Sequence, residues 1–337
     1  MVDHSRVNRL QNGWIQVKVP LPFALKWVNA YLVPSSEGWT VIDPGLRTEE
    51  TTTYWTEILR EFKICATDIK QIVLTHHHPD HYGMAGWFQE LADGAPVYMS
   101  QVARDAAMRL WDEQETFSDE LTEAFLQHGM DPSLKGDMLE HMRSFRERVS
   151  PHPELVNFIA VGSTIQMGDI SWLAIGGEGH APGHLSFYDS SSKQLICGDQ
   201  VLPDISPNIG WMPGGDPNPL RAFLASLNNM SSLDVSTAYP GHRDPFTSFQ
   251  SRIEQLLEHH EQRLVKMIEL MGDDTVTAFE LCERLFSNRL GSNAHQLRFA
   301  LAETIAHLIE LEQRKLIVRE QANDRLTIKY VKAKAYK

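Results

Sequence analysis

The segment that most constrains this chain is a dense group of potential metal ligands, Thr75-His76-His77-His78-Pro79-Asp80-His81, in the order His-x-His-x-Asp-His. It follows Gln71-Ile72-Val73-Leu74, an apolar, β-branched run that is typical of a buried strand. Such a strand supports the loop beyond its carboxyl end, and Pro79 stiffens the turn because its φ angle is fixed. Imidazole nitrogens bind divalent cations at about 2.0–2.1 Å. We therefore interpret the loop as part of a metal site rather than as a polar surface loop.

Three later segments carry further ligand-type residues after turn or strand signals. They are Gly179-His180-Ala181-Pro182-Gly183-His184, Gln194-Leu195-Ile196-Cys197-Gly198-Asp199 and Ala238-Tyr239-Pro240-Gly241-His242. With the first motif, they resemble the metallo-β-lactamase superfamily, and the resemblance covers nearly the entire chain. It implies an α/β fold, the αββα metallo-β-lactamase sandwich, to which the helical pattern at about 101–153 adds an insertion and the C-terminal segment adds a winged-helix-like domain.

The resemblance also implies two metal ions, each held by a triad of side chains and joined by a bridging carboxylate. The first triad is His76, His78 and His180, the second is Asp80, His81 and His242, and the bridging carboxylate is Asp199. Two cations can share a water and lower its pKa from 15.7 towards about 7, which gives a bridging hydroxide as nucleophile. Asp80 lies beside this hydroxide in related enzymes and is the candidate catalytic residue. Zinc is the default for such nitrogen-rich ligands, while iron and manganese stay open.

Four polar residues near these motifs are candidates for supporting roles. Asp43, in a turn similar to the Ile-Asp-x-Gly turn of the family, is expected to support the metal loop or to cap its own turn. His184 is placed behind the ligands. Asn208 could bind an oxyanion and Arg243 a carboxylate or phosphate, although a structural role is the stronger expectation for both.

The length of 337 residues predicts a catalytic domain plus an accessory one. We place the catalytic domain at residues 1–252, with a helical insertion at about 101–153, and the accessory domain at residues 253–337. The insertion contains Met108, Met130, Met138 and Met142. Adaptable methionines suggest a flap over the metal site, and packing of these side chains onto the core explains them equally well.

The accessory domain is predicted to contain helices at 253–271 and 293–314, a helix opened by a Thr277–Glu280 capping box, and a hairpin around Ala322-Asn323-Asp324. This order resembles the winged-helix domain of one metallo-β-lactamase subgroup. Its last strand and tail are rich in basic residues: Lys315, Arg319, Arg325, Lys329, Lys332, Lys334 and Lys337. They could meet nucleic-acid phosphates, but we favour a protein-contact or homodimerisation module with a solvated basic tail.

Composition narrows the function classes. The net charge of −13 argues weakly against a surface that tracks nucleic acid throughout. No apolar run approaches the ~20 residues that cross a bilayer, and the polar N-terminus has no signal-peptide core. We therefore expect a cytoplasmic protein without membrane contact. Cys65, Cys197 and Cys282 have no paired spacing and are expected to be small core residues.

The first functional hypothesis is a binuclear metal-dependent hydrolase that acts on a small ester, thioester or lactone, similar to the glyoxalase II and lactonase branches of the superfamily. The alternative is a metal-dependent endoribonuclease or other nuclease, because a winged-helix relative acts on single-stranded RNA. A second alternative is a nucleic-acid-binding regulator with a vestigial metal site, against which the complete ligand set argues.

Overall fold

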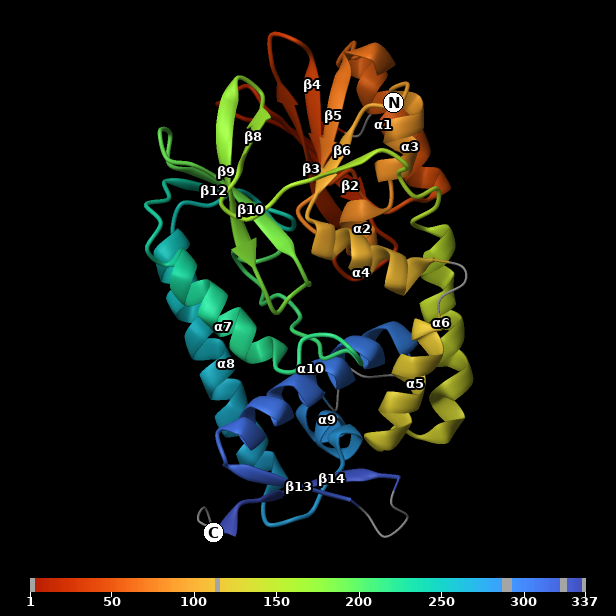
Figure 1. The fold of residues 1–337 in the computed structure, drawn as a ribbon, viewed down its shortest axis with the longest axis vertical. Coiled ribbons are helices and arrows are strands. Elements are labelled where there is room, and N and C mark those ends of the chain that lie inside the picture. The colour runs from red at the N-terminus through yellow and green to blue at the C-terminus, as the bar shows by residue number, and fades with distance from the viewer. Residues whose placement is uncertain (1–3, 113–115, 287–292, 322–325, 335–337) are drawn as a thin grey trace.

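Two β-sheets stacked face to face form the centre of the N-terminal part of the protein (Figure 1). The computed structural model describes residues 4–112, 116–286, 293–321 and 326–334. Helices cover the outer faces of the sheets, and a helical C-terminal part lies at the opposite end of the molecule from the N-terminus (Figure 1). This is the predicted metallo-β-lactamase sandwich.

The first sheet has the strand order β1-β2-β3-β4-β5-β6-β7. Its strands are β1 (Val7–Arg9), β2 (Ile15–Pro20), β3 (Trp27–Pro34), β4 (Trp39–Ile42), β5 (Ile69–Val73), β6 (Val97–Met99) and β7 (Val156–Phe158). Neighbouring strands are antiparallel from β1 to β4 and parallel from β4 to β7. The carboxyl ends of β4 and β5 therefore meet at one edge of the sheet.

The second sheet has the order β12-β11-β10-β9-β8. Its strands are β8 (Thr164–Met167), β9 (Ile170–Gly177), β10 (His184–Asp189), β11 (Gln194–Gly198) and β12 (Thr237–Pro240). Strands β11 and β12 run parallel, so the residues that follow them also share an edge.

Aromatic side chains fill the space between the two sheets. On the side of the first sheet, Trp14 precedes β2 and Tyr31 lies on β3. Both lie in one buried cluster with Trp172, Phe187 and Tyr239 of the second sheet. The ring of Trp14 lies 4.8 Å from that of Tyr239 and 5.5 Å from that of Trp172, measured between centroids. Such pairs add about 0.5–1.5 kcal/mol beyond burial, so the cluster holds the sheets in a fixed relation.

Helices on the outer faces bury the remaining sides of the sheets. They are α1 (Glu49–Glu61), α2 (Pro79–Tyr82), α3 (Ala85–Leu91) and α7 (Pro219–Met230), with short 3₁₀ turns η1 (His4–Arg6) and η2 (Ala66–Asp68). Helix α8 (Phe249–Met271) follows and packs mainly against α7, α9 and β14. The hydroxyl of Thr48 accepts from the Thr51 N–H at 3.0 Å and so caps α1.

The segment predicted as a helical insertion consists of α4 (Gln101–Trp111), α5 (Phe117–Gln127), η3 (Pro132–Leu134) and α6 (Lys135–Glu147). Met130, Met138 and Met142 are buried in its core. These methionines pack the helices together. They do not occur in the described lining of the cavity discussed below, to which the segment contributes other residues.

The C-terminal part contains α9 (Ala278–Phe286), α10 (Ala294–Gln313) and the antiparallel pair β13 (Ile317–Gln321) and β14 (Ile328–Lys332). The capping box is confirmed, because Thr277 N–H donates to Glu280 at 2.7 Å and Glu280 N–H donates to Thr277 Oγ1 at 3.1 Å. Helix α10 is buried along most of its length and packs against α6, α7 and α9. The predicted turn Ala322-Asn323-Asp324 lies outside the described residues, as do Arg325 and Lys337.

The structure tests two expectations drawn from composition, one about the cysteines and one about membrane-spanning segments. Cys197 and Cys282 are buried, but Cys65 is exposed, so its assignment to the core was wrong. Cys65 lies in the connection between α1 and β5, where the chain runs over the surface. Within the described ranges, none of the helices has the length and apolar character that a membrane span requires.

Candidate metal centre

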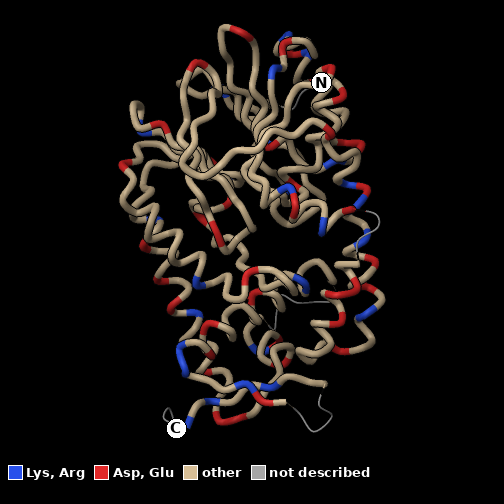
Figure 2. The backbone as a smooth tube through the Cα atoms, viewed as in Figure 1, with Lys and Arg blue, Asp and Glu red and all other residues tan. Residues whose placement is uncertain are grey.

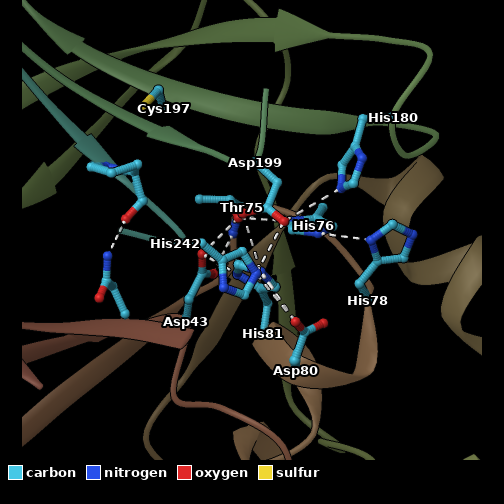
Figure 3. A network of polar contacts seen from close by, with 12 residues as sticks. Asp43, Thr75, His76, His78, Asp80, His81, His180, Cys197, Asp199 and His242 are labelled. Carbon is cyan, nitrogen blue, oxygen red and sulfur yellow. Dashed lines mark hydrogen bonds and ion pairs between the residues drawn. The ribbon is translucent and has the colours of Figure 1, made fainter. Parts of the chain in front are cut away.

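The predicted metal ligands converge at the edge where β5, β11 and β12 end (Figure 3). His76 and His78 lie on the loop after β5, and Asp80 and His81 lie on α2. The other three come from the second sheet: His180 precedes β10, Asp199 follows β11 and His242 follows β12. Strand ends from both sheets thus bring together residues that are far apart in the chain.

The ligand atoms form two groups with the composition of the predicted triads. One atom from each of His76, His78 and His180 lies within 4.8 Å of the others, and the same holds for Asp80, His81 and His242. His76 Nε2 and His78 Nδ1 are 3.1 Å apart. Two ligands on one tetrahedral ion with bonds of about 2.0–2.1 Å are separated by roughly 3.3 Å, so this spacing fits a shared cation.

The Asp199 carboxylate lies between the two groups. Its Oδ1 is 3.4 Å from His81 Nε2, while its Oδ2 is 3.7 Å from His180 Nε2 and 3.4 Å from His242 Nε2. A single carboxylate therefore faces ligands of both triads, which is the position of a bridging group.

Hydrogen bonds on the far side of the rings determine which nitrogen faces the centre. His180 Nδ1 lies 2.9 Å from the Asn208 carbonyl oxygen, and His242 Nδ1 lies 2.9 Å from that of Trp27. A carbonyl oxygen only accepts, so each Nδ1 carries the hydrogen and each Nε2 presents a lone pair.

Asp43 orients two further ligands from behind. Its Oδ2 accepts from Thr75 Oγ1 at 2.7 Å and from His81 Nδ1 at 2.9 Å, and its Oδ1 accepts from the Thr75 N–H at 2.8 Å. The Thr75 hydroxyl hydrogen is thus committed to Asp43, so the hydroxyl accepts from His76 Nδ1 at 2.9 Å. This leaves the Nε2 lone pairs of His76 and His81 free for a metal. The supporting role predicted for Asp43 is confirmed by these contacts.

Several atoms that face the centre are buried without a hydrogen bond. They are His81 Nε2, His180 Nε2, His242 Nε2 and Asp199 Oδ1. Orphaned buried polar atoms normally cost about 1–3 kcal/mol each. Convergence of such atoms, with lone pairs aligned, fits a site that binds divalent cations.

Burial and neighbouring charges divide the histidines electrostatically. Burial lowers the pKa of His76, His78 and His180, and nearby imidazoles lower the first two further, so these rings are neutral ligands. Burial also acts to lower the pKa of His242, but Asp199 and Asp80 outweigh it and raise that pKa to about 10. The carboxylates therefore favour positive charge in this second group, either as a proton on His242 Nε2 or as a bound cation that takes the place of this proton.

Close packing around Asp199 requires a glycine beside it. A Cβ atom on Gly241 would lie 2.2 Å from Asp199 Oδ1 and 2.5 Å from His81 Cε1.

Asp43, His76 and His81 also form a compact group of potential ligands. Asp43, however, is fully engaged with Thr75 and His81 and serves as support.

The remaining sequence candidates have structural contacts. His184 Nε2 accepts from the Asp199 N–H at 3.3 Å. Asn208 Nδ2 donates to Glu303 at 2.8 Å and to the Phe299 carbonyl at 3.2 Å, so both of its N–H groups are engaged and the oxyanion role is wrong. Arg243 does not occur in the described lining of the cavity over the centre, which argues against the anion-binding role.

A cavity of about 410 Å³ opens over the centre. Its floor includes His78, Asp80, His180, Asp199 and His242. Its walls are largely apolar and come from the N-terminal part, the helical segment 101–153 and α10: Phe23, Leu25, Leu110, Trp111, Leu121, Phe145 and Phe299. A second cavity of about 330 Å³ shares His78 and His180 with the first.

Sequence reasoning did not identify the residues that α10 contributes to the cavity. Arg298 and His295 lie on its first turns, and both line the cavity. In the sequence they follow the ordinary pattern of a partly apolar helix, so only the packing of the helix against the catalytic domain reveals them.

Comparison with known proteins agrees with this geometry. The profile of the Metallo-beta-lactamase superfamily matches residues 28–242, and that of the Metallo-beta-lactamase-like, C-terminal domain matches residues 264–333. A Bacillus subtilis (strain 168) protein named "Probable metallo-hydrolase YqjP" is 29% identical over 90% of this chain and 93% of its own length. The crystal structure of a metallo-beta-lactamase family protein from Thermus thermophilus has a TM-score of 0.84 and 33% identity, covering 95% of this chain and 98% of that one. A more distant relative, "Thioesterase pkgB" from Emericella nidulans, is 23% identical over 75% of this chain and 56% of its own length.

Proposed function

The chain belongs to the metallo-β-lactamase superfamily, and we propose that it hydrolyses a small ester, thioester or lactone with two divalent ions. That it is a metal-dependent hydrolase follows from its relatives and from its clusters of metal-binding side chains. The number of ions and the acyl substrate are the proposal.

The observation that carries the proposal is the pair of ligand triads with Asp199 between them, at the floor of a largely apolar cavity. Nitrogen-rich triads of this kind suit zinc. Bound divalent ions would supply Lewis acidity, which activates water near neutral pH and polarises a carbonyl oxygen.

The residues of the chain would supply positioning and proton transfer. Asp80 is the most exposed carboxylate of the centre, at 21% of its side-chain surface against 8% for Asp199 and 3% for Asp43. It therefore faces the cavity, where it can accept the proton of the attacking water and return it to the leaving group. The rings of Trp111, Phe145 and Phe299 would exclude bulk water and hold an apolar acyl or thiol part.

Relatives support acyl chemistry, because one of them is named as a thioesterase. For the C-terminal part we propose a winged-helix-like module whose main role is to complete the cavity. Helix α10 is buried against the rest of the protein and contributes Arg298, Phe299 and Glu303 to the cavity wall.

The proposal is tested by initial hydrolysis rates of metal-loaded protein on thioesters, lactones, a β-lactam and single-stranded RNA. Asp80→Asn keeps the shape of the side chain and removes its basicity, so acyl turnover is expected to fall by about 10²–10⁴-fold. Asp169→Asn is a matched control, because Asp169 is a surface carboxylate that contacts Ser36, on the loop after β3.

Acyl turnover that depends on Asp80 and not on Asp169 supports the proposal. Turnover of RNA alone, or acyl turnover that Asp80→Asn leaves intact, would overturn it.

A further inference from the structure

One buried cation in the cavity forms no salt bridge with a carboxylate of the described residues. Arg298 is only 7% exposed and lines the cavity on α10. Its Nη1 lies 3.7 Å from the sulfur of Met142, a weak acceptor, and its Nε is buried without a hydrogen bond. Buried arginines are almost always paired with carboxylates, so this arrangement calls for an explanation.

Other arginines that pack around α10 follow the usual rule. Arg263 donates to Glu303 at 2.7 Å, Arg314 to Glu310 at 2.7 Å, and Arg221 to Glu310 at 3.2 Å. Glu303 also lines the cavity, but it is engaged by Arg263 and Asn208 and is not available to Arg298.

Aromatic rings hold the guanidinium in place. It lies 4.2 Å from the centroid of Phe299 and 5.6 Å from that of Phe145. These contacts favour the charged form of the side chain. His295 Nδ1 is a second buried polar atom without a hydrogen bond in the same cavity, with its ring stacked on Phe23 at 4.5 Å.

Electrostatics agree with a charged Arg298. Burial lowers its pKa to about 10, while the Asp80 carboxylate acts in the opposite direction, so the side chain stays protonated at neutral pH. Burial lowers the pKa of His295 to about 4, with Arg298 acting in the same sense, and the imidazole is neutral there. The neighbouring His141 is also neutral, since burial and then Arg298 lower its pKa to about 3. Of these three neighbouring side chains, Arg298 is thus the charged one, and it lines the cavity.

We propose that Arg298 binds an anionic group of the substrate, a carboxylate or a phosphate, while the scissile carbonyl lies at the metal centre. This rests on the proposed acyl hydrolysis and narrows it to acyl compounds that carry a negative charge beyond an apolar spacer. The planar guanidinium matches the two oxygens of such a group. His295 Nδ1 is placed to add a second polar contact.

The test compares thioesters that differ only in their far end. One ends in a carboxylate, one in the corresponding neutral amide and one in a phosphonate. The wild-type, metal-loaded protein is expected to prefer an anionic end to the amide by about 10–100-fold in kcat/KM, the range that a charge-assisted pair provides. The better of the two anionic ends identifies whether the natural group is of the carboxylate or the phosphate type.

Three variants assign the preference to Arg298. Arg298→Met is expected to remove it, and Arg298→Lys, which keeps the charge without the planar fork, to retain part of it. Arg148→Met is the matched control, because Arg148 lies over the same Phe145 ring at 5.5 Å but does not occur in the described lining of the cavity. It should retain the full preference. If circular dichroism shows that Arg298→Met fails to fold, the test uses the ratio of kcat/KM for the anionic end to that for the amide end in the wild type and in Arg298→Lys. A lower ratio in Arg298→Lys supports the inference, and an equal ratio overturns it.

A binding measurement separates this inference from the proposed function. Calorimetry uses uncleavable analogues in which a methylene replaces the thioester carbonyl, with an acid or an amide end. Tighter binding of the acid that depends on Arg298 supports the inference even if no acyl substrate is hydrolysed. Equal affinity for both ends, or an acid preference that persists in Arg298→Met, overturns the inference even if hydrolysis occurs.

Discussion

Asp43 is a buried carboxylate that orients two of the predicted metal ligands. It accepts three hydrogen bonds, from the Thr75 backbone, the Thr75 hydroxyl and His81. Through these contacts it fixes the ring orientation of both His81 and His76. Residues from both triads therefore depend on a side chain in a turn more than thirty positions earlier, as the Asp43–Thr75 separation shows.

Asp43→Asn is expected to weaken metal binding by about 10–100-fold, because an amide offers one acceptor oxygen and a donor in place of two acceptors. Competition with a chromophoric chelator measures this affinity. Asp169→Asn, at the surface, should bind metal like the wild type. An Asp43→Asn variant with unchanged affinity would show that the ligands orient themselves.

At the level of elements, two buried imidazoles connect α8 to α10. His260 and His307 are fully buried, and His260 Nδ1 lies 3.1 Å from His307 Nε2. His307 Nδ1 lies 2.8 Å from the Glu303 carbonyl oxygen and donates to it. His307 Nε2 is thus an acceptor and His260 Nδ1 a donor, a bond that requires a neutral His307, and burial disfavours a charge on either ring.

This pair makes stability dependent on pH. Burial, and then His307, lower the pKa of His260 to about 2, whereas the unfolded chain binds the proton near pH 6.5. The unfolded state therefore takes up more protons as the pH falls below about 6.5, and the free energy of unfolding decreases. For one imidazole the loss is about 2 kcal/mol between pH 7.5 and pH 5.

His260→Leu should remove that part of the pH dependence. The measurement is urea unfolding at both pH values, and the expected decrease in stability is smaller in the variant by about 2 kcal/mol. His4→Leu, at an exposed position, should keep the wild-type decrease. Equal pH dependence in His260→Leu and wild type would mean that the folded pair accommodates a proton.

At the scale of the whole molecule, charge and burial bear on nucleic-acid partners. Helix α10 is the element that a winged-helix domain would insert into a groove, yet Leu301, Ile305 and Leu308 are completely buried on it. Acidic residues lie among the basic ones of the C-terminal hairpin region (Figure 2), where Glu312 pairs with Arg319 at 2.6 Å.

We therefore expect weak binding of single-stranded RNA, no tighter than about 10⁻⁶ M at physiological salt, the range of non-specific contacts. Fluorescence anisotropy across a salt series measures it. A dissociation constant well below about 10⁻⁶ M, together with RNA cleavage that Asp80→Asn abolishes, would restore the nuclease alternative.

The sequence predicted what local patterns encode. The ligand motifs follow strands, and apolar alternation and capping residues marked most elements, such as the Thr277–Glu280 box. The wall formed by α10 could not be predicted, because Arg298 lies far along the chain from every ligand motif and its helix resembles any partly buried helix. Exposure of Cys65 and engagement of the Asn208 amide likewise depend on tertiary contacts that no local pattern records.

The central claim is that acyl hydrolysis requires two ions, and its most direct test is a metal titration of activity. Protein stripped by a chelator receives increasing zinc, and thioester hydrolysis is measured at each addition. The two triads and the shared Asp199 predict that the rate reaches its plateau only at two equivalents per chain. A full rate at one equivalent, or no thioester hydrolysis at any metal content, would contradict the account.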